Sequence, residues 1–303
     1  MRTLFLTIII LFISQQVYSQ YTDAINSNEP SESFSAFSVG KDVIQLETNV
    51  SIYNQKNKLL NTNLRGSSID FSLRYGLYKE EFEIITYGNY QYDLISNLPG
   101  DNSRLLFRHY FRELKIGLKY LILDPLKDYD ESPNVYSYRA NNKFKWKKII
   151  PAISVMMGIN YDSNENPYII YKSKTLSPYI LLSTQNNFNN NMVIITNFLF
   201  NRISTSNNSF EYIITITKAL NPNLVIFMEN KNVKSDYLSY KTFRSGLAYL
   251  INKNLQFHTS LSANSSEKGD IMLQPTFFIE DRKNINFGFS YRLDFHEDKL
   301  LDK

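Results

Sequence analysis

The sequence contains no cysteine, and this absence removes two classes of exported protein. Without a thiol the chain can carry neither a disulfide framework nor the lipid anchor of a lipoprotein. Beyond the first 19 residues it also lacks any apolar run long enough for a membrane-spanning helix. An exported chain of this kind is either water-soluble or a closed β-barrel, the other structure that satisfies its backbone hydrogen bonds in lipid.

Histidine is scarce, with three residues among 303, and this argues against catalytic and metal-binding functions. His109, His258 and His296 have no metal-ligand partner at a helpful spacing. His258 and Ser260 share a strand face, but residues two apart on a strand lie about 6–7 Å apart, which is too far for a base and its nucleophile. No phosphate loop or glycine-rich nucleotide motif is present. We therefore predict no enzymatic activity, metal or other cofactor, with a barrel lipase or protease as the remote alternative.

Tryptophan occurs once, whereas tyrosine and phenylalanine are abundant, with 22 and 21 residues. This aromatic excess suits the girdles that outer-membrane barrels place at both membrane interfaces. The formal net charge of +4 is small for the length, and lysine and arginine form no stripe that alternates with aromatic residues. A groove for single-stranded nucleic acid would require such a stripe, so we predict no nucleic-acid partner.

The N-terminal residues have the organisation of a secretory signal peptide. Arg2 precedes an apolar run from Leu4 to Ile13, and the small residue Ser19 stands at the expected cleavage site. We predict a cleaved signal peptide over residues 1–19 and export through the inner membrane. The remaining chain of about 280 residues is long enough for one large all-β domain.

Long alternating segments follow, and the clearest is the hairpin Tyr240–Ala263. In both of its arms apolar and polar residues alternate, and the polar turn Asn252–Asn254 joins the arms. This pattern predicts two β-strands, because successive side chains on a strand point to opposite faces. Each arm has about ten residues, which is the length that a tilted strand needs to cross a bilayer.

Similar segments recur along the chain, with one apolar face and one face that repeatedly carries charges. The raw count is thirteen, but a barrel with both ends in the periplasm needs an even number. Pro275 interrupts the segment Ile271–Ile279, so we predict twelve strands; fourteen would result if Arg104–Phe111 also formed one. The twelve are residues 42–54, 69–77, 82–93, 114–122, 149–161, 176–185, 192–201, 210–220, 223–231, both arms of the hairpin, and 285–295.

The predicted fold is therefore an all-β, antiparallel, up-and-down transmembrane barrel over residues 41–295. A polar, extended leader over residues 20–40 precedes it and can be tucked into a lumen, and a charged tail over residues 296–303 follows it. A soluble β-sandwich is the alternative, but it does not explain so many long strands with charges on the inner face. Short turns, as in bacterial outer-membrane barrels, are predicted at 78–81, 186–191, 220–223, 251–254 and 281–284.

The polar faces of these strands carry charged and titratable residues that define a candidate lumen and solute path. A charge that faces lipid is expensive, so we expect them to point inward and to be paired or hydrated. Glu229 and Arg244 lie on adjacent antiparallel strands and are the best candidates for a pair that gates or lines the path. The lumen-lining residues are Glu47, Asp70, Arg74, Glu113, Lys115, Lys119, Glu211, Glu229, Arg244, His258 and Arg292. On the apolar faces, the residues chosen as lipid-facing are Ile216, Leu247, Phe257 and Phe289.

Short motifs stand in a fixed order along nearly the whole mature chain. They are Pro30–Ser33, Val39–Gly40, Ile44–Thr48, Leu73–Leu77, Ile116–Tyr120, Ile226–Glu229, Ser245–Tyr249 and Phe287–Arg292. In this order they resemble the phenol meta-pathway degradation family of predicted outer-membrane transporters. The resemblance implies an outer-membrane barrel that passes or binds small, hydrophobic molecules.

These observations predict a bacterial outer-membrane channel or transporter that passes small solutes through a polar lumen and has membrane lipid as its surroundings. The alternative is a structural or assembly barrel that holds another envelope protein, and the oligomeric state is left open. Solute-dependent conductance would favour the first function, and stable co-purification with another protein would favour the second.

Overall fold

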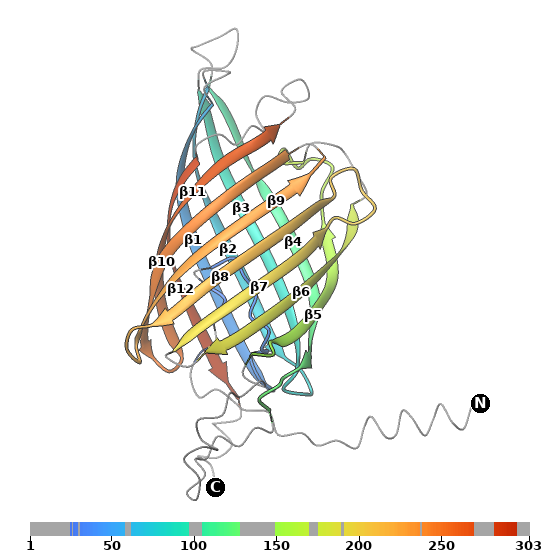
Figure 1. Cartoon of the computed structure of the whole chain (residues 1–303). Coiled ribbons are helices and arrows are strands. Elements are labelled where there is room, and N and C mark those ends of the chain that lie inside the picture. Colours follow the sequence, from blue (N-terminus) through green and yellow to red (C-terminus); the bar gives the residue numbers. More distant parts are fainter. Residues whose placement is uncertain are drawn as a thin grey trace, which may run out of the picture.

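The computed structural model is a closed barrel of twelve antiparallel strands (Figure 1). Each strand pairs with its neighbours in sequence, and β1 pairs with β12 to close the barrel. The predicted up-and-down barrel is therefore confirmed. The strands are β1 Val43–Asn57, β2 Thr62–Gly76, β3 Phe82–Ser96, β4 Leu106–Leu123, β5 Ala152–Tyr161, β6 Leu176–Phe188, β7 Met192–Asn201, β8 Ser209–Ala219, β9 Leu224–Ser235, β10 Leu238–Asn252, β11 Leu255–Gly269 and β12 Arg282–Asp294.

The structure describes most of the barrel and part of the leader. The predicted signal peptide, the charged tail and the segment Ile271–Ile279 lie outside the described residues. Within the described part of the chain, no helix is long and apolar enough to cross a membrane. The described residues are 25, 27–29, 31–57, 62–96, 105–127, 149–169, 175–188, 191–236, 238–269 and 282–295.

Some strands are longer than the sequence pattern predicts. The option of a separate strand at Arg104–Phe111 is wrong, because most of this segment forms the first part of β4 and pairs with β3. Lys283 and Asn284, predicted in a turn, belong to β12 and pair with β1. β2 begins at Thr62, well before the start of the predicted strand 69–77. Ladder pairing with neighbouring strands extends these strands past the point where apolar alternation fades.

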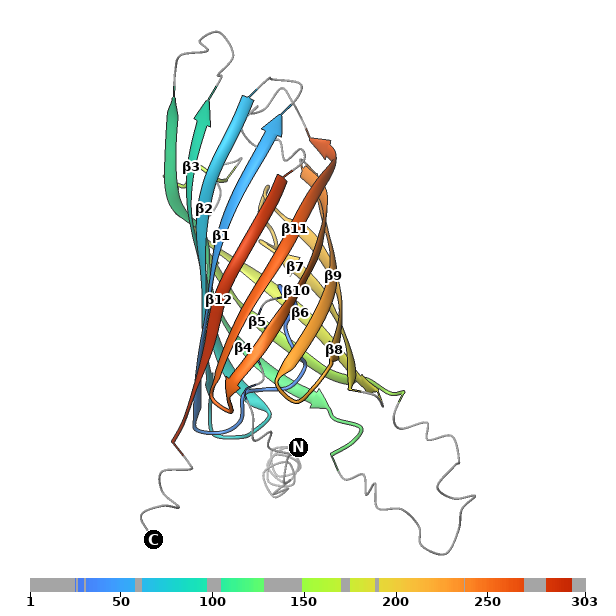
Figure 2. The same cartoon turned by 90° about the vertical axis from the view of Figure 1, so that its left-hand side faces the viewer.

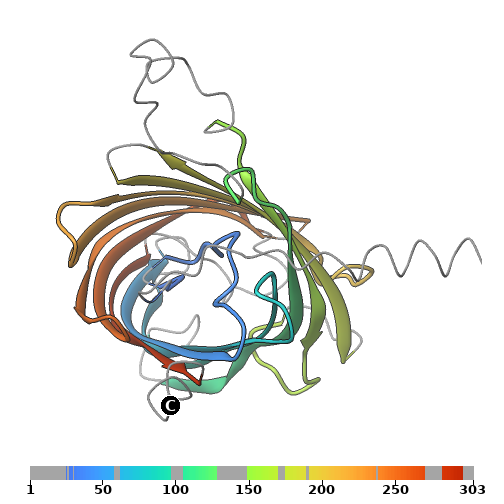
Figure 3. The same ribbon diagram turned by 90° about the horizontal axis from the view of Figure 1, so that it is seen from below.

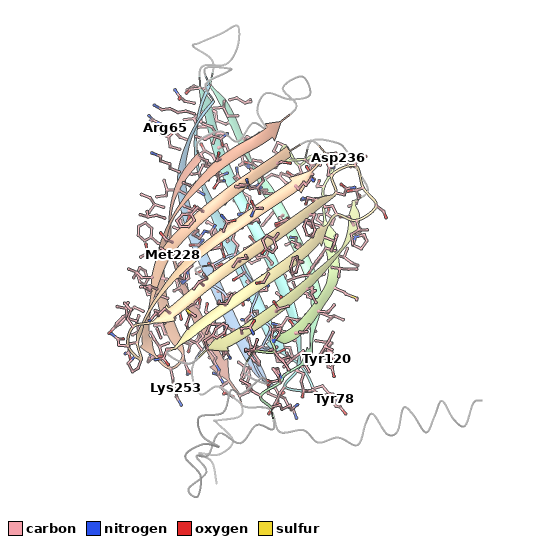
Figure 4. All side chains as sticks on the ribbon, in the orientation of Figure 1. Arg65, Tyr78, Tyr120, Met228, Asp236 and Lys253 are labelled. Atoms are coloured by element: carbon pink, nitrogen blue, oxygen red, sulfur yellow. The ribbon has the colours of Figure 1, made fainter. Side chains whose placement is uncertain are left out.

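Apolar side chains cover the outside of the barrel, and most of the side chains that fill its inside are polar. Figure 4 shows side chains such as Met228 and Tyr120 on the outer surface. Phe289 is 48% exposed, whereas the adjacent Ser290 is fully buried. Ile216, Leu247 and Phe257, chosen from the sequence as lipid-facing, are also exposed. A water-soluble barrel has the reverse distribution, so this one suits hydrocarbon outside and a polar interior.

The leader, whose described residues are 25, 27–29 and 31–40, runs inside the barrel. Figure 3 shows it in blue, crossing the interior of the barrel when the barrel is seen from below. Figure 2 shows that it lies toward the end of the barrel at which β1 begins and β12 ends. The leader therefore fills the lumen at that end.

The leader enters β1 through a sharp bend at Gly40. The φ angle of Gly40 is 100°, in the left-handed region that side-chain-bearing residues rarely adopt. Gly76 lies against this bend, and a Cβ atom on Gly76 would collide with the carbonyl oxygen of Gly40. The amide N–H of Asp42 donates to the carbonyl oxygen of Gly76 over 3.0 Å. Two glycines and one hydrogen bond thus fix the point where the leader turns into the barrel wall.

Candidate functional site

The structure places the predicted lumen residues on the inner face of the barrel. Asp70, Glu113 and Lys115 are partly exposed, and the first two of these line an internal cavity. The other eight are almost fully buried, although several carry formal charges. These eight are Glu47, Arg74, Lys119, Glu211, Glu229, Arg244, His258 and Arg292. Since buried charges require partners, the partners define what the lumen does.

Four charged residues form a buried network near the leader, on four consecutive strands. Arg74 of β2 lies 3.4 Å from Glu47 of β1 and 3.1 Å from Glu83 of β3. Lys119 of β4 lies 2.5 Å from Glu83. All four side chains are at most 1% exposed. The network alternates the two signs of charge, so each member has a partner of opposite charge.

This network also binds the backbone of the leader. The Nζ of Lys119 donates to the carbonyl oxygens of Ser35, over 3.0 Å, and of Phe37, over 2.8 Å. A carboxylate oxygen of Glu83 accepts the N–H of Val39 over 2.9 Å. The leader therefore supplies hydrogen bonds that the charged groups would otherwise take from water.

Glu32 of the leader occupies the predicted functional pair. Arg244 and Glu229 stand directly opposite one another in the β9–β10 ladder, 3.8 Å apart. The Glu32 carboxylate pairs with Arg244 and also with Lys231, over 2.9 Å. The Glu229 carboxylate accepts the N–H of Glu32 over 2.9 Å and the hydroxyl of Thr215 over 2.9 Å. The pair predicted from the sequence is thus part of a clamp on the leader.

The clamp keeps Glu32 ionised. Burial alone would raise the pKa of Glu32, but the adjacent Arg244 and Lys231 outweigh burial and hold that pKa below its ordinary value. Both the side chain and the backbone N–H of Glu32 are therefore bound, by cations and by a carboxylate respectively. This double attachment anchors the leader at Glu32.

Glu29 of the leader lies in a different environment. Its Oε2 is 3.8 Å from the Nε2 of the fully buried His258, and it accepts no hydrogen bond among the residues that the structure describes. Burial raises the pKa of Glu29 well above its ordinary value, and the charges of Asp70 and Glu47 add to the increase. We therefore expect Glu29 to take up a proton at a higher pH than an ordinary glutamate, in contrast to Glu32.

Aromatic and amide side chains hold the middle of the leader. Phe34 packs against the buried apolar cluster Ile85, Met156, Tyr179, Leu181 and Leu199. The side-chain amide of Asn197 accepts the N–H of Phe34 over 2.6 Å and donates to its carbonyl oxygen over 2.9 Å. This pairing copies the hydrogen bonds that a neighbouring strand would make.

An open cavity of about 220 Å³ lies beyond the leader, and Glu32 forms part of its lining. Its wall is mainly polar and includes three tyrosines, Tyr87, Tyr168 and Tyr240. Five cationic and four acidic side chains line it, which leaves one positive charge in excess. The cationic residues are Arg112, Arg202, Lys231, Arg244 and Arg282, and the acidic ones are Glu32, Asp70, Glu113 and Glu211.

A β-bulge in β4 shapes this wall. Asn89 of β3 pairs with Glu113, the next residue Tyr90 pairs with Phe111, and Arg112 is left without an opposite residue. Arg112 and Glu113 are adjacent in sequence, yet both line the cavity. A bulge inserts one extra residue and re-aims the side chains around it. A strict alternation of inward and outward residues therefore does not identify Arg112 as a residue of the lumen.

Other residues of the lumen were missed for different reasons. Glu83 stands on a strand whose inner face also carries Ile85 and Tyr87, so its polar face is not distinct. Arg202 lies in the loop after β7, and Arg282 was assigned to a turn. An even number of positions separates Glu83 from Asp93, so both lie on the same face of β3. This spacing between two acidic residues could have indicated that Glu83 points inward. Among the described residues, no group of three or more histidine, aspartate or glutamate side chains could hold a metal ion.

Comparisons with known proteins agree with this architecture. A family model described as "Putative MetA-pathway of phenol degradation" matches residues 27–270. An outer-membrane channel from Pseudomonas putida F1 has a similar structure, with a TM-score of 0.54, 9% sequence identity, and coverage of 88% of this chain and 100% of that one. No curated protein matches the sequence significantly.

Two further solved barrels are similar at lower scores. The translocator domain of the autotransporter NalP from Neisseria meningitidis has a TM-score of 0.46, 10% identity, and coverage of 84% of this chain and 89% of that one. The CymD monoaromatic hydrocarbon channel has a TM-score of 0.43, 8% identity, and coverage of 84% and 89%.

Proposed function

The chain belongs to the MetA-pathway phenol-degradation family, and on this basis we propose that it is an outer-membrane channel for small solutes. The family match also confirms the resemblance drawn from the sequence motifs. The observation that carries the proposal is the distribution of side chains, with an apolar outer surface around a charged interior that contains an open cavity. A barrel that only filled its interior for stability would have no need of that cavity.

The proposed location is the bacterial outer membrane, reached by export with a cleaved signal peptide over residues 1–19. The apolar outer surface supports insertion into a bilayer, because each exposed Leu, Ile or Phe lowers the free energy of the inserted barrel. Cell fractionation tests this location. We expect the mature chain, beginning near Gln20, in the outer-membrane fraction, and recovery in the soluble periplasmic fraction would contradict the proposal.

The proposed solutes are small molecules that combine an apolar body with a polar group. The cavity of about 220 Å³ is smaller than the roughly 300–1,000 Å³ pockets that hold drug-sized ligands. Tyr87, Tyr168 and Tyr240 offer ring surfaces, and the charged and amide side chains between them offer hydrogen bonds. A purely apolar solute would leave these polar groups without partners, which disfavours it.

The leader supports a further part of the proposal, namely that this conformation is the closed or narrow state. It fills the lumen at one end, and Glu32 is held there by Arg244, Lys231 and Glu229. In this reading Glu229 and Arg244 act as a gate through their hold on the leader. The remaining predicted lumen residues line the path on either side of it.

Single-channel recording in planar bilayers tests the channel directly. We expect the full-length chain to insert and to give small or intermittent currents. The Glu229→Gln and Arg244→Gln variants should insert equally well but conduct more, because each removes part of the clamp on Glu32. Absence of solute-dependent current in the full-length chain and in both variants would contradict the channel function.

A further inference from the structure

Two arginines that line the cavity lack the partners that the other cationic residues have. Arg202, Lys231 and Arg244 each form an ion pair with a carboxylate. Arg112 and Arg282, by contrast, have no carboxylate oxygen within 4.0 Å among the residues that the structure describes. A guanidinium group stays charged throughout the working pH range, so both charges remain uncompensated at short range.

The carboxylates on the same wall are already engaged. Glu32 and Glu211 pair with cations, and Glu113 lies 2.6 Å from the Nζ of Lys115. Asp70 has no cationic partner within the described part of the chain, but it accepts hydrogen bonds from Asn89 and from Tyr87, the latter over 3.2 Å. Among the carboxylates of this wall that the structure describes, none is therefore left free for either arginine.

Both guanidinium groups are held in place by neutral neighbours. Arg112 donates to the side-chain oxygen of Gln91 over 3.4 Å. Arg282 donates through Nε to Asn284 over 3.1 Å, and its Cζ lies 3.6 Å from the centre of the Tyr53 ring. A cation over an aromatic ring at this distance is attracted to the ring face, which orients the guanidinium.

The two guanidinium groups belong to side chains that line the same cavity. None of their nitrogens is among the buried side-chain atoms that lack a hydrogen-bond partner within the described structure. Because both line this cavity, their like charges oppose one another. Two like charges that face one cavity are most stable when an anion lies between them.

We propose that Arg112 and Arg282 form a binding site for the carboxylate of a small organic acid. A planar guanidinium matches the two oxygens of a carboxylate through parallel hydrogen bonds. The wall has one positive charge in excess, which suits a monoanion better than a phosphate dianion beside four acidic residues. The cavity limits the body of the acid to about one ring, which would lie against the tyrosines.

The site rests on the proposed channel function, in which it would select the solutes that enter the lumen. Its test is a binding measurement rather than a conductance measurement, so either idea can fail without the other. The probe is benzoate, and benzamide is its neutral counterpart of the same shape. Isothermal calorimetry of the full-length, detergent-solubilised protein should show binding of benzoate and much weaker binding of benzamide.

Substitution of either arginine should weaken benzoate binding by about 10–100-fold, as expected when hydrogen bonds to a charged group are lost. The variants are Arg112→Gln and Arg282→Gln. Arg112→Lys and Arg282→Lys keep the charge and remove the fork, so they should retain part of the affinity. If a glutamine variant does not fold, the lysine variant of the same position still tests the site.

Arg65→Gln is the control, because it removes an arginine charge from an exposed position of β2 that does not line the cavity. We expect benzoate affinity to change little in this variant. Equal weakening in Arg112→Gln, Arg282→Gln and Arg65→Gln would overturn the site, since it would indicate a general effect of charge. Binding of inorganic phosphate more tightly than benzoate, or equal binding of benzamide and benzoate, would overturn it as well.

Discussion

The two ends of the lumen contain similar side chains but use them differently. At the end where β1 begins, charged residues such as Arg74, Glu83 and Lys119 are fully buried and bind the leader. At the other end, Arg112 and Arg282 face an open cavity. The difference indicates that a charged barrel interior becomes a packed core where a segment of the same chain supplies backbone donors and acceptors. Where no such segment is present, the interior remains a cavity.

The broadest way to break this comparison is to remove the leader. Deletion of residues 27–38 takes away Glu32, both phenylalanines and the backbone groups bound by Lys119. The two ends of the lumen should then become alike, and the conductance in planar bilayers should rise several-fold. Heat-modifiable migration on gels provides the control for barrel folding, because the described residues of the leader form no strand. Unchanged conductance in a folded deletion variant would show that the leader does not obstruct the path.

A narrower change is Arg244→Gln at the clamp. Removing one partner of a buried ion pair typically costs about 3–5 kcal/mol, because a buried charge is left uncompensated. We expect the cost to fall on leader docking, measured as faster protease cleavage within residues 31–40 in reconstituted protein. Arg202→Gln is the matched control, since its ion pair with Asp162 lies in the loops around the cavity. Equal cleavage of both variants and the wild type would contradict the clamp.

The barrel wall provides a comparison of its own, between deep and shallow outer positions. Leu247 and Ile251 are both exposed on β10, and Ile251 is next to the end of the strand. Leu247→Arg should lower the free energy of unfolding by about 2–4 kcal/mol, whereas Ile251→Arg near the rim should cost about 0–1 kcal/mol. Denaturant unfolding in lipid vesicles measures both values. Equal costs at the two positions would contradict the assignment of this face to lipid.

The smallest expected effect is a pH dependence of leader docking. The pKa of Glu29 is raised above the ordinary value of 4.5 in the docked leader, mainly by burial. The docked state therefore favours the proton, so docking is strongest below pH 4.5 and weakens as the pH rises through the raised value. Conductance should increase over that range, and Glu29→Gln should remove this dependence. The lowered pKa of Glu32 acts in the opposite direction, but only at acidity below that range.

The sequence predicted the barrel because the relevant information is local. Alternation along β1, β2 and β10 assigned Glu47, Arg74 and Arg244 to the inner face, and the structure places all three there. The pairing of Glu229 with Arg244 was also accessible, since both strands are adjacent in sequence. Where lipid and lumen impose opposite requirements on successive residues, the pattern of each strand carries its own orientation.

What the sequence did not reveal depends on contacts between distant residues or on one irregularity. Glu32 and Arg244 are 212 positions apart, and nothing in either local pattern indicates that they meet. The bulge at Arg112 shifts the alternation of inward and outward side chains within β4. A fixed period of two therefore cannot assign the residues before and after the bulge to the correct faces. The arrangement of the cavity follows from these two features, and it therefore required the structure.

The bend at Gly40 makes the leader a tethered ligand of its own barrel. A tethered group has an effective concentration in the millimolar range when its linker is short, and released leader would therefore return to its site faster than a separate peptide could compete. Opening would be a unimolecular event whose duration depends on the residence time of the leader and not on protein concentration. Cleavage of the backbone between Gly40 and the clamp at Glu32 would convert brief openings into lasting ones, because the released segment would dissociate by dilution.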